Sequence, residues 1–229
     1  MTAKEQAAAK ALEFVQSGMV LGLGSGSTSK IFVDMLGEKL KNGELENIVG
    51  IPTSEATAAQ AKDLGIPLST IDKHGVIDLA VDGADEVDPD LQLVKGWGRA
   101  LLREKMVEIH AKELVIIVDD SKLVEKLGTR DFIPVEVVQF GCGATIRWMN
   151  ESLEGCRAEL WNEDGAPVVT DNGNYLVKLF CDGGVEDPYI LADMLAIRPG
   201  VVEHGLFLDL ATKVVVAGES GIQVLEKDA

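Results

Sequence analysis

The chain has 229 residues, 46% of them hydrophobic and 26% charged, which is the composition of an ordinary soluble globular protein. This length suits one large domain, or one domain with a smaller companion. The 21 Lys and Arg residues against 38 Asp and Glu residues give a formal net charge of −17. So acidic a chain repels nucleic acid and anionic membranes, and we expect neither as a partner.

The cysteines and the N-terminal segment both point to the cytoplasm. Three cysteines without a C-x-x-C spacing predict buried free thiols in a reducing compartment, rather than a disulfide framework or a zinc knuckle: Cys142, Cys156 and Cys181. The first 18 residues are rich in alanine and carry charges throughout, unlike a signal peptide. The apolar stretches are too short to span a bilayer. We therefore expect a cytoplasmic protein.

Strands and helices alternate in the first part of the chain. Helical spacing is predicted for residues 3–16, 25–40, 54–65 and 99–112, and strands for 19–24, 47–53, 66–70, 76–88 and 113–122. The strands are apolar on both faces, which is typical of a parallel sheet covered by helices on both sides.

After Pro134 the order changes to strand, helix, strand, strand, helix, strand, which is the ferredoxin-like arrangement. The last residues read as two more strands, which we expect to rejoin the first sheet. The sequence therefore predicts an α/β fold, with a doubly wound, mostly parallel sheet and an inserted smaller ferredoxin-like domain. The Rossmann-like catalytic domain is assigned to 1–132 plus 208–229, and the inserted domain to 133–207.

Four polar loops follow four of the predicted strands, at the sheet edge where ligands of open parallel sheets bind. They are GLGSGSTS (22–29), DGADE (82–86), KGWGR (95–99) and DDSK (119–122). The first has glycines, hydroxyl donors and a helix N-terminus, which together make a good phosphate cradle. It lacks the lysine of a nucleotide P-loop and the third glycine of G-x-G-x-x-G. A plain strand-to-helix turn explains it about equally well.

The other loops carry candidate catalytic groups. Asp82 and Asp85 flank two small residues and are suited to contacting sugar hydroxyls or moving protons, although a solvated acidic turn is the better explanation on these residues alone. Glu104 falls on or beside the apolar stripe of its helix, where partial burial raises a carboxyl pKa and suits a proton acceptor. Lys122 would meet an anion at the same edge, or is an ordinary surface lysine. No constellation of metal ligands is visible.

With these loops the chain closely resembles the A-type ribose-5-phosphate isomerases. The matching segments follow in family order over nearly the whole length: VLGLGSGST, IPTSEAT, LGIPL, IDLAVDGADEVD, KGxGxALLREK, VIIVDDSKLVEKLG, IPVEVV, VTDNGN and PGVVEHGLF. The resemblance implies a two-domain fold and interconversion of ribose 5-phosphate and ribulose 5-phosphate without metal or organic cofactor. It also implies a sugar-phosphate substrate and a homo-oligomer, a homodimer or a tetramer.

The resemblance also implies a role for each site residue. Glu104 matches the general base, Asp82 and Asp85 match the carboxylates of ring opening and proton traffic, and Lys95 matches the cation at the developing enediolate oxygen. The expected substrate-binding residues are Ser25, Gly26, Ser27, Thr28, Gly83, Ala84, Gly96, Trp97, Gly98, Lys122 and Lys4.

Three residues depart from the family pattern. Trp97 stands where glycine is usual, Arg99 where glycine or alanine is usual, and Lys178 where Asp is common. Trp97 must therefore take an L-residue conformation where the family tolerates positive φ. Its side chain would point away from the crevice, cover the substrate or obstruct it. The alternative function is a catalytically weakened homologue, or a sugar-phosphate sensor of the same fold.

Overall fold

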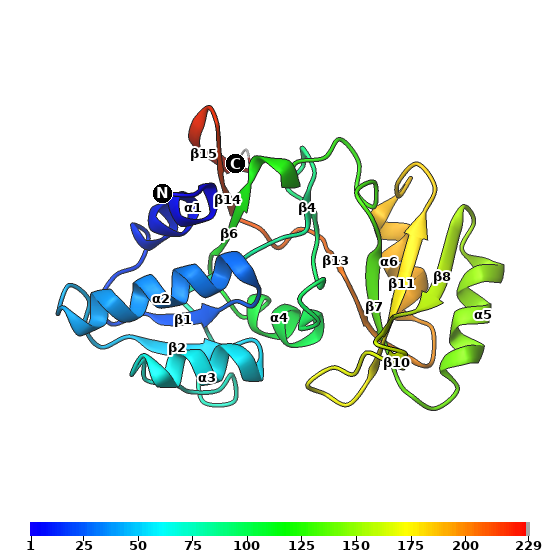
Figure 1. The fold of residues 1–229 in the computed structure, drawn as a ribbon, viewed down its shortest axis with the longest axis horizontal. Coiled ribbons are helices and arrows are strands. Elements are labelled where there is room, and N and C mark those ends of the chain that lie inside the picture. Colours follow the sequence, from blue (N-terminus) through cyan, green and yellow to red (C-terminus); the bar gives the residue numbers. More distant parts are fainter. Residues whose placement is uncertain (228–229) are drawn as a thin grey trace. The chain divides into compact units, whose positions relative to one another are not determined.

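The computed structural model describes residues 1–227, which divide into two compact units (Figure 1). Unit 1 contains Met1–Ala84, Arg103–Lys122 and the segment from Asp209; unit 2 contains Asp85–Leu102 and Leu123–Leu208. Unit 2 thus takes 85–102 and 123–132, which the sequence assigned to the first domain. The reason is local pairing, because β5 (Leu93–Val94) pairs antiparallel with both β4 (Glu86–Val87) and β13 (Leu206–Phe207).

The sheet of unit 1 has the strand order β15-β14-β6-β3-β1-β2. Its strands are β1 (Val20–Leu23), β2 (Val49–Pro52), β3 (Leu79–Asp82), β6 (Leu114–Asp119), β14 (Lys213–Gly218) and β15 (Gly221–Glu226). All neighbours are parallel except β14 and β15, so the last two strands rejoin this sheet as predicted. The parallel strands follow the doubly wound order 2-1-3-4-5, in which the strand order changes direction between β1 and β3. Open α/β sheets bind their ligands at such a switch point.

Helices cover both faces of this sheet. They are α1 (Ala3–Leu12), α2 (Ser27–Lys41), α3 (Glu55–Asp63) and α4 (Leu101–Glu108), with a 3₁₀ turn at Asp120–Lys122. Apolar residues of α1 and α2, such as Phe32 and Leu36, form the core of one face with the strands. On the other face, Val107 of α4 packs with Ile51 and Ile77. The predicted doubly wound architecture is confirmed for this unit.

The predicted strand at 66–70 is wrong, because only Leu68 forms a parallel bridge, to Gly50. Gly50 exchanges hydrogen bonds with Pro67 O and Ser69 N–H, at 2.8 and 2.9 Å. Pro67 lacks the N–H that a longer ladder requires, so pairing stops after one residue.

Unit 2 is built on the sheet β12-β7-β11-β8, in which every neighbouring pair is antiparallel. Its chain order is β7 (Ile133–Val137), α5 (Cys142–Ser152), β8 (Cys156–Leu160), β11 (Tyr175–Cys181), α6 (Pro188–Ala196) and β12 (Val201–His204). This is the predicted ferredoxin-like arrangement. A short hairpin of β9 (Asn162–Glu163) and β10 (Ala166–Pro167) is inserted between β8 and β11.

The expectation of three free thiols is wrong. Cys156 and Cys181 form a disulfide, and Cys142 is the free, buried cysteine of the described chain. The pair face each other across β8 and β11, with Cα atoms 4.1 Å apart. The sequence separation of 25 hides this register, because nothing local indicates which strands pair.

In residues 1–227, no helix combines the length and the apolar character that crossing a membrane would require.

Candidate active-site residues

Asp82 fastens the glycine loop of unit 1 at the switch point between β1 and β3. Its side chain is fully buried, and its Oδ1 accepts hydrogen bonds from Ser25 N–H (3.0 Å), Gly83 N–H (2.7 Å) and Ser29 Oγ (2.7 Å). A Cβ on Gly24 would lie 2.1 Å from this oxygen, so only glycine lets the chain pass so close. The Asp82 carboxylate therefore joins the two predicted loops, 22–29 and 82–86, through its hydrogen bonds.

Ser25 also enters a group of hydroxyls that sequence reasoning missed. Its Oγ lies 2.8 Å from Thr53 Oγ1, 2.8 Å from Ser54 Oγ and 3.2 Å from Thr57 Oγ1. Ser54 is the N-cap of α3 and accepts the Thr57 N–H at 3.1 Å. The available signal was the S-x-x-T pattern directly after a predicted strand, which places hydroxyls at the same sheet edge.

The start of α2 carries the predicted phosphate-binding groups. Gly26 precedes the helix with φ 102°, a conformation that glycine adopts without strain, and Ser27 and Thr28 open the first turn. The N–H groups of such a turn are oriented for an anion. Lys4 Nζ donates a hydrogen bond of 2.8 Å to Ser27 Oγ, so the first helix adds a cation to this site.

Two lysines act together on Asp119, the last residue of β6. Burial alone would raise the pKa of this carboxyl, but hydrogen bonds from Ser121 and the charges of Lys122 and Lys4 outweigh it and hold the pKa below its usual value. Lys122, which sequence reasoning left open as a surface lysine, therefore lies within electrostatic reach of the same carboxylate as Lys4. Two ammonium groups thus lie near the end of β6, beside the carboxylate of Asp119.

Glu104 lies in the first turn of α4 and is 3% exposed, a deeper burial than the sequence pattern predicts. The far end of the helix is tied to the start of β3, because Ile77 N–H donates to His110 O at 2.9 Å. The first turn must then lie toward the carboxyl ends of the strands. The ion pair of the neighbouring Arg103 with Glu55, the first residue of α3, agrees (2.7 Å). Glu104 is thus at the same edge of unit 1 as Asp82.

The remaining catalytic candidates belong to unit 2. Asp85 Oδ2 accepts the Trp97 N–H at 2.9 Å. Lys95 is 2% exposed, its N–H donates to Gly205 O at 2.8 Å, and its Nζ lies 5.3 Å from the centre of the Phe207 ring. Burial of a lysine this deep places its ammonium where water screens it poorly.

Residues 96–99 form a turn closed by a hydrogen bond of 2.9 Å from Arg99 N–H to Gly96 O. Gly96 has φ 110°, and a Cβ there would lie 2.9 Å from Leu101. Trp97 and Gly98 keep negative φ, whereas Arg99 takes φ 70°. The strained L-residue of the loop is therefore Arg99.

Glu86 is not part of a solvated acidic turn. It is buried, and its carboxylate accepts hydrogen bonds from Gly128 N–H and, at 2.7 Å, from Arg130 N–H. Arg130 in turn donates to Asp85 O at 2.9 Å. Glu86 therefore anchors the 128–130 segment beside the acidic loop, a role that the run of acidic residues in the sequence concealed.

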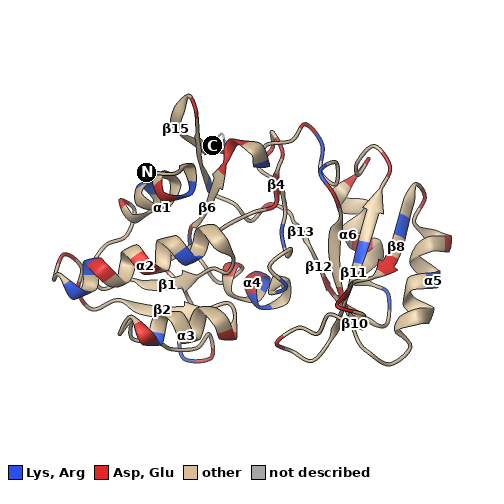
Figure 2. Cartoon of the chain, in the orientation of Figure 1, with Lys and Arg blue, Asp and Glu red and all other residues tan. Residues whose placement is uncertain are grey.

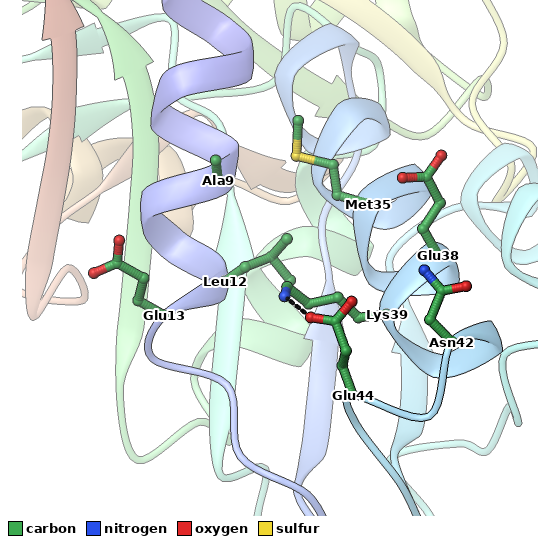
Figure 3. A pocket seen from close by; sticks show the side chains of 8 residues that line it. All are labelled: Ala9, Leu12, Glu13, Met35, Glu38, Lys39, Asn42 and Glu44. Carbon is green, nitrogen blue, oxygen red and sulfur yellow. Dashed lines mark hydrogen bonds and ion pairs between the residues drawn. The ribbon is translucent and has the colours of Figure 1, made fainter.

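A hollow of about 480 Å³ lies at the other end of α2 and does not suit a phosphate (Figure 3). Three glutamates line it, and its one lysine, Lys39, is paired with Glu44 at 2.6 Å. The C-terminal ends of helices carry a partial negative charge, which adds to the repulsion. Its lining residues are Ala9, Leu12, Glu13, Met35, Glu38, Lys39, Asn42 and Glu44.

A second hollow, of about 500 Å³ in unit 2, lies beside the disulfide and is likewise acidic. Its charged lining residues are Glu154, Asp182, Glu186 and Asp187. Among residues 1–227, no three or more His, Cys, Asp or Glu side chains gather as a metal site would require.

The fold and these loops define a class of protein. It has an open, doubly wound α/β sheet, a glycine-rich loop suited to an anion at the switch point, and a buried carboxylate, Glu104, on α4. The family model for ribose 5-phosphate isomerase A (phosphoriboisomerase A) matches residues 49–221. The chain belongs to this family. The matched range includes Asp82, Lys95 and Glu104.

Individual relatives extend the similarity to nearly the whole chain. The Arabidopsis thaliana protein named "Probable ribose-5-phosphate isomerase 2" is 54% identical over 98% of this chain and 86% of its own length. Ribose-5-phosphate isomerase A of Chloroflexus aurantiacus is 51% identical over 97% of this chain and 92% of its own. Among solved structures, ribose 5-phosphate isomerase from Plasmodium falciparum matches with a TM-score of 0.95 and 37% identity, over 99% of both chains.

Proposed function

We propose that this protein interconverts D-ribose 5-phosphate and D-ribulose 5-phosphate, as a step of the non-oxidative pentose phosphate pathway. The observation that carries the proposal is the position of Glu104. It is a buried carboxylate in the first turn of α4, at the same sheet edge as Asp82 and the glycine loop. A chain of this family with these groups at one edge has the parts that an aldose–ketose isomerisation needs.

In the proposed reaction, the Glu104 carboxylate takes the proton from C2 of the open-chain aldose and returns it to C1. One base can reach both carbons because the intermediate is a planar cis-enediolate. Asp82 and Asp85 assist ring opening and move the proton between O1 and O2. The electron pair of the broken C2–H bond passes into the enediolate, so no external oxidant or reductant is consumed.

Lys95 stabilises the developing enediolate oxygen in this proposal. A fixed cation in a buried position stabilises developing charge more than a hydrated surface lysine does, because little water screens it. The 2% exposure of Lys95 supports this role. Gly83, Ala84, Gly96 and Gly98 are proposed to contact the sugar through the backbone.

The phosphate is proposed to bind at the start of α2. The N–H groups and hydroxyls of Ser25–Thr28 and the ammonium groups of Lys4 and Lys122 are the donors for it. The hydrogen bond between Lys4 and Ser27 and the shared effect of both lysines on Asp119 support this assignment. A local cationic site is required because the chain as a whole carries a charge of −17 and repels a phosphate.

The test is a coupled isomerase assay with ribose 5-phosphate in the presence of a chelator, on the wild type and two matched variants. Glu104→Gln is expected to lower kcat by about 10²- to 10⁴-fold, the usual contribution of a general base. Glu108→Gln is the control, because Glu108 lies one turn further along α4 and is also 3% exposed. Its kcat should stay close to that of the wild type.

Two results would contradict the proposal. Wild-type protein that binds the sugar phosphate without turnover above background would leave a binding protein and not an isomerase. Equal losses in the two glutamine variants would mean that burial of a carboxylate, and not proton transfer by Glu104, explains the effect.

We further propose that the protein forms a homodimer or tetramer, needs no metal or organic cofactor, and has no nucleic-acid partner. The predicted cytoplasmic location loses its support from free thiols, because Cys156 and Cys181 form a disulfide. The resemblance to the family supports the oligomer and the lack of a cofactor, and the acidic charge supports the absence of nucleic acid. Light scattering of the purified protein measures the oligomeric state, and dialysis against a chelator before the assay tests the cofactor.

A further inference from the structure

Three side chains of unit 2 meet around the same aromatic rings: Trp97, Arg99 and Lys178. The Trp97 ring stacks on Phe132 with centroids 5.4 Å apart and an interplanar angle of 28°. The Arg99 guanidinium lies 5.6 Å from the centre of the Trp161 ring, and the Lys178 ammonium lies 4.8 Å from Phe132 and 5.2 Å from Trp161. The turn 96–99 and β11 thus converge on the same two rings, which indicates one packing arrangement rather than three unrelated contacts.

These rings form an aromatic cluster, defined here as Trp97, Phe132, Trp161 and Phe180. Phe132 is its centre, with Trp161 edge-on at 5.0 Å and Phe180 edge-on at 5.8 Å. Phe180 points to the face of β11 opposite the helices, because its neighbours Leu179 and Cys181 belong to the helix-side core. Phe132 and Trp161 are only 7% and 6% exposed. The aromatic cluster is therefore a second small core of unit 2.

Trp97 is the member of the aromatic cluster that comes from the turn after Lys95. Its indole Nε1 donates to Phe132 O at 2.9 Å, and its backbone N–H donates to Asp85 Oδ2 at 2.9 Å. One residue thus connects the turn both to the aromatic cluster and to the carboxylate of the acidic loop. Gly96 and Gly98 on either side give the backbone little stiffness of its own. The side chain of Trp97 supplies the restraint that the two glycines lack.

We infer that Trp97 is a positioning residue for the isomerisation: by packing on Phe132 it fixes the turn 96–99, which holds Asp85 and keeps Lys95 in place. The inference rests on the proposed function. It favours the first of the three orientations considered for this ring, away from the substrate, because the ring face stacks on Phe132 and the indole N–H donates to Phe132 O. The guanidinium of Arg130, 5.9 Å from the Trp97 ring centre, adds to this packing.

The experiment compares three variants of the full chain. Trp97→Ala removes the ring and its N–H, and Trp97→Phe keeps an aromatic ring and removes the N–H. Trp148→Ala is the matched control: Trp148 is a partly buried tryptophan of the same unit, on α5, where it packs on the helix-side core under Arg198. Each protein is assayed for kcat and KM, and its backbone amide exchange is measured at residues 97 and 99.

The expected result is a loss in kcat without a loss of substrate affinity. Trp97→Ala should lower kcat by about tenfold to 100-fold, because small displacements of a catalytic group have effects of this size. KM should change by no more than about twofold, since the phosphate anchor is unaffected. Trp97→Phe should recover most of the lost kcat. Trp148→Ala should lower the melting temperature and leave kcat unchanged.

Amide exchange tests the restraint independently of turnover. In Trp97→Ala the amides of residues 97 and 99, now less restrained, should exchange at least about tenfold faster, and in Trp148→Ala they should not. Unchanged exchange at both amides, an unchanged or increased kcat in Trp97→Ala, or a rise in KM alone would each overturn the inference. A wild type without turnover would instead refute the proposed function, and the exchange data would still decide whether Trp97 fixes the turn.

Discussion

The loop of unit 1 and the loop of unit 2 are fixed by different physical means. In unit 1, Oδ1 of Asp82 accepts hydrogen bonds from two backbone N–H groups and a serine hydroxyl. In unit 2, the turn 96–99 is fixed by the stacking of Trp97 on Phe132. A polar anchor of the first kind mostly uses backbone donors, which tolerate changes in neighbouring side chains. An aromatic anchor depends on the identity of both rings, so the second loop is the more specific to this chain. Figure 2 shows the Lys and Arg positions of β8 and β11 in blue. On β11, the Lys178 ammonium lies 4.8 Å from the Phe132 ring and 5.2 Å from the Trp161 ring.

Asp82 and Asp85 carry this contrast within a single motif. Asp82 is fully buried and accepts three hydrogen bonds on Oδ1, whereas Asp85 is partly exposed and its Oδ2 accepts the N–H of Trp97. Of two aspartates three positions apart, Asp82 therefore holds its own loop through Oδ1, whereas Asp85 is held by the N–H of Trp97.

The largest loss of stability is expected when the Asp82 carboxylate is removed. Asp82→Ala removes the acceptor of the buried Ser29 hydroxyl and of two half-buried N–H groups, of which Gly83 N–H keeps Ser29 Oγ as a second acceptor at 3.0 Å. Each unsatisfied group costs about 1–3 kcal/mol, so we expect about 2–4 kcal/mol of destabilisation. Asp85→Ala leaves a partly solvated N–H and should cost about 1 kcal/mol. Urea unfolding of both variants measures the difference. Equal free-energy losses would mean that the two carboxylates are anchored alike and that the contrast is wrong.

The next prediction tests how closely the glycine loop approaches Asp82. Gly24→Ala places a methyl group in the position of Asp82 Oδ1, and overpacking of this kind costs about 1–3 kcal/mol. In an Asp82→Ala background the contacts with Oδ1 and Cγ disappear and only the 2.6 Å contact with the Asp82 Cβ is left, so the two losses should add to less than their sum. Unfolding free energies of the single and double variants give the coupling. Strict additivity would show that Gly24 is required for some other reason.

The sequence predicted the helices and strands better than it predicted which strands pair with one another. The spacing of apolar residues and the polarity of each segment are local properties. The doubly wound sheet and the order of helices and strands along the inserted part could therefore be predicted. The Cys156–Cys181 pair and the assignment of 85–102 to unit 2 depend on which strands meet, and pairing across many residues leaves no local signal. The strand predicted at 66–70 failed because Pro67 ends the ladder.

The candidate site shows the same limit. Glu104 could be placed near the apolar stripe of its helix from its spacing alone, and burial confirms that placement. The anchoring role of Glu86 could not be read, because a run of acidic residues is usually solvated and its partners lie about 40 residues later. Lys178 is far from the loop at 95–99 in the sequence, yet the aromatic cluster joins them through Phe132.

A smaller effect on stability is expected from the backbone conformation of Arg99, in the turn 96–99. Arg99 has φ 70°, a left-handed conformation that costs an L-residue about 1 kcal/mol relative to glycine, and its ion pair with Glu163 is exposed. Arg99→Ala loses the ion pair and keeps the strain, whereas Arg99→Gly loses the ion pair and relieves the strain. We expect the glycine variant to be more stable than the alanine variant by about 1 kcal/mol. Thermal unfolding measures this, and the reverse order would contradict the strain at position 99.

The smallest effect concerns the charges of unit 1 and depends on pH. The pKa of Asp119 is lowered in the folded state, because hydrogen bonds from Ser121 and the charges of Lys122 and Lys4 outweigh the effect of burial. A carboxyl whose folded pKa is depressed contributes stability above its unfolded pKa of about 3.9, and this contribution is lost as the pH falls through the folded pKa. Asp119→Asn should therefore be less stable than the wild type at pH 7, by less than about 1 kcal/mol, and the difference should vanish in acid.

Salt separates this charge effect from the aromatic one. The difference between wild type and Asp119→Asn at pH 7 should shrink as salt is raised toward 1 M, because the Debye length falls to about 3 Å. The difference between wild type and Trp97→Ala should not shrink, since stacking on Phe132 is not an interaction between net charges. A difference for Asp119→Asn that does not respond to salt would assign the effect to the hydrogen bonds from Ser121 rather than to the charges of Lys122 and Lys4. A difference that persists in acid would mean that ionisation of Asp119 does not cause it.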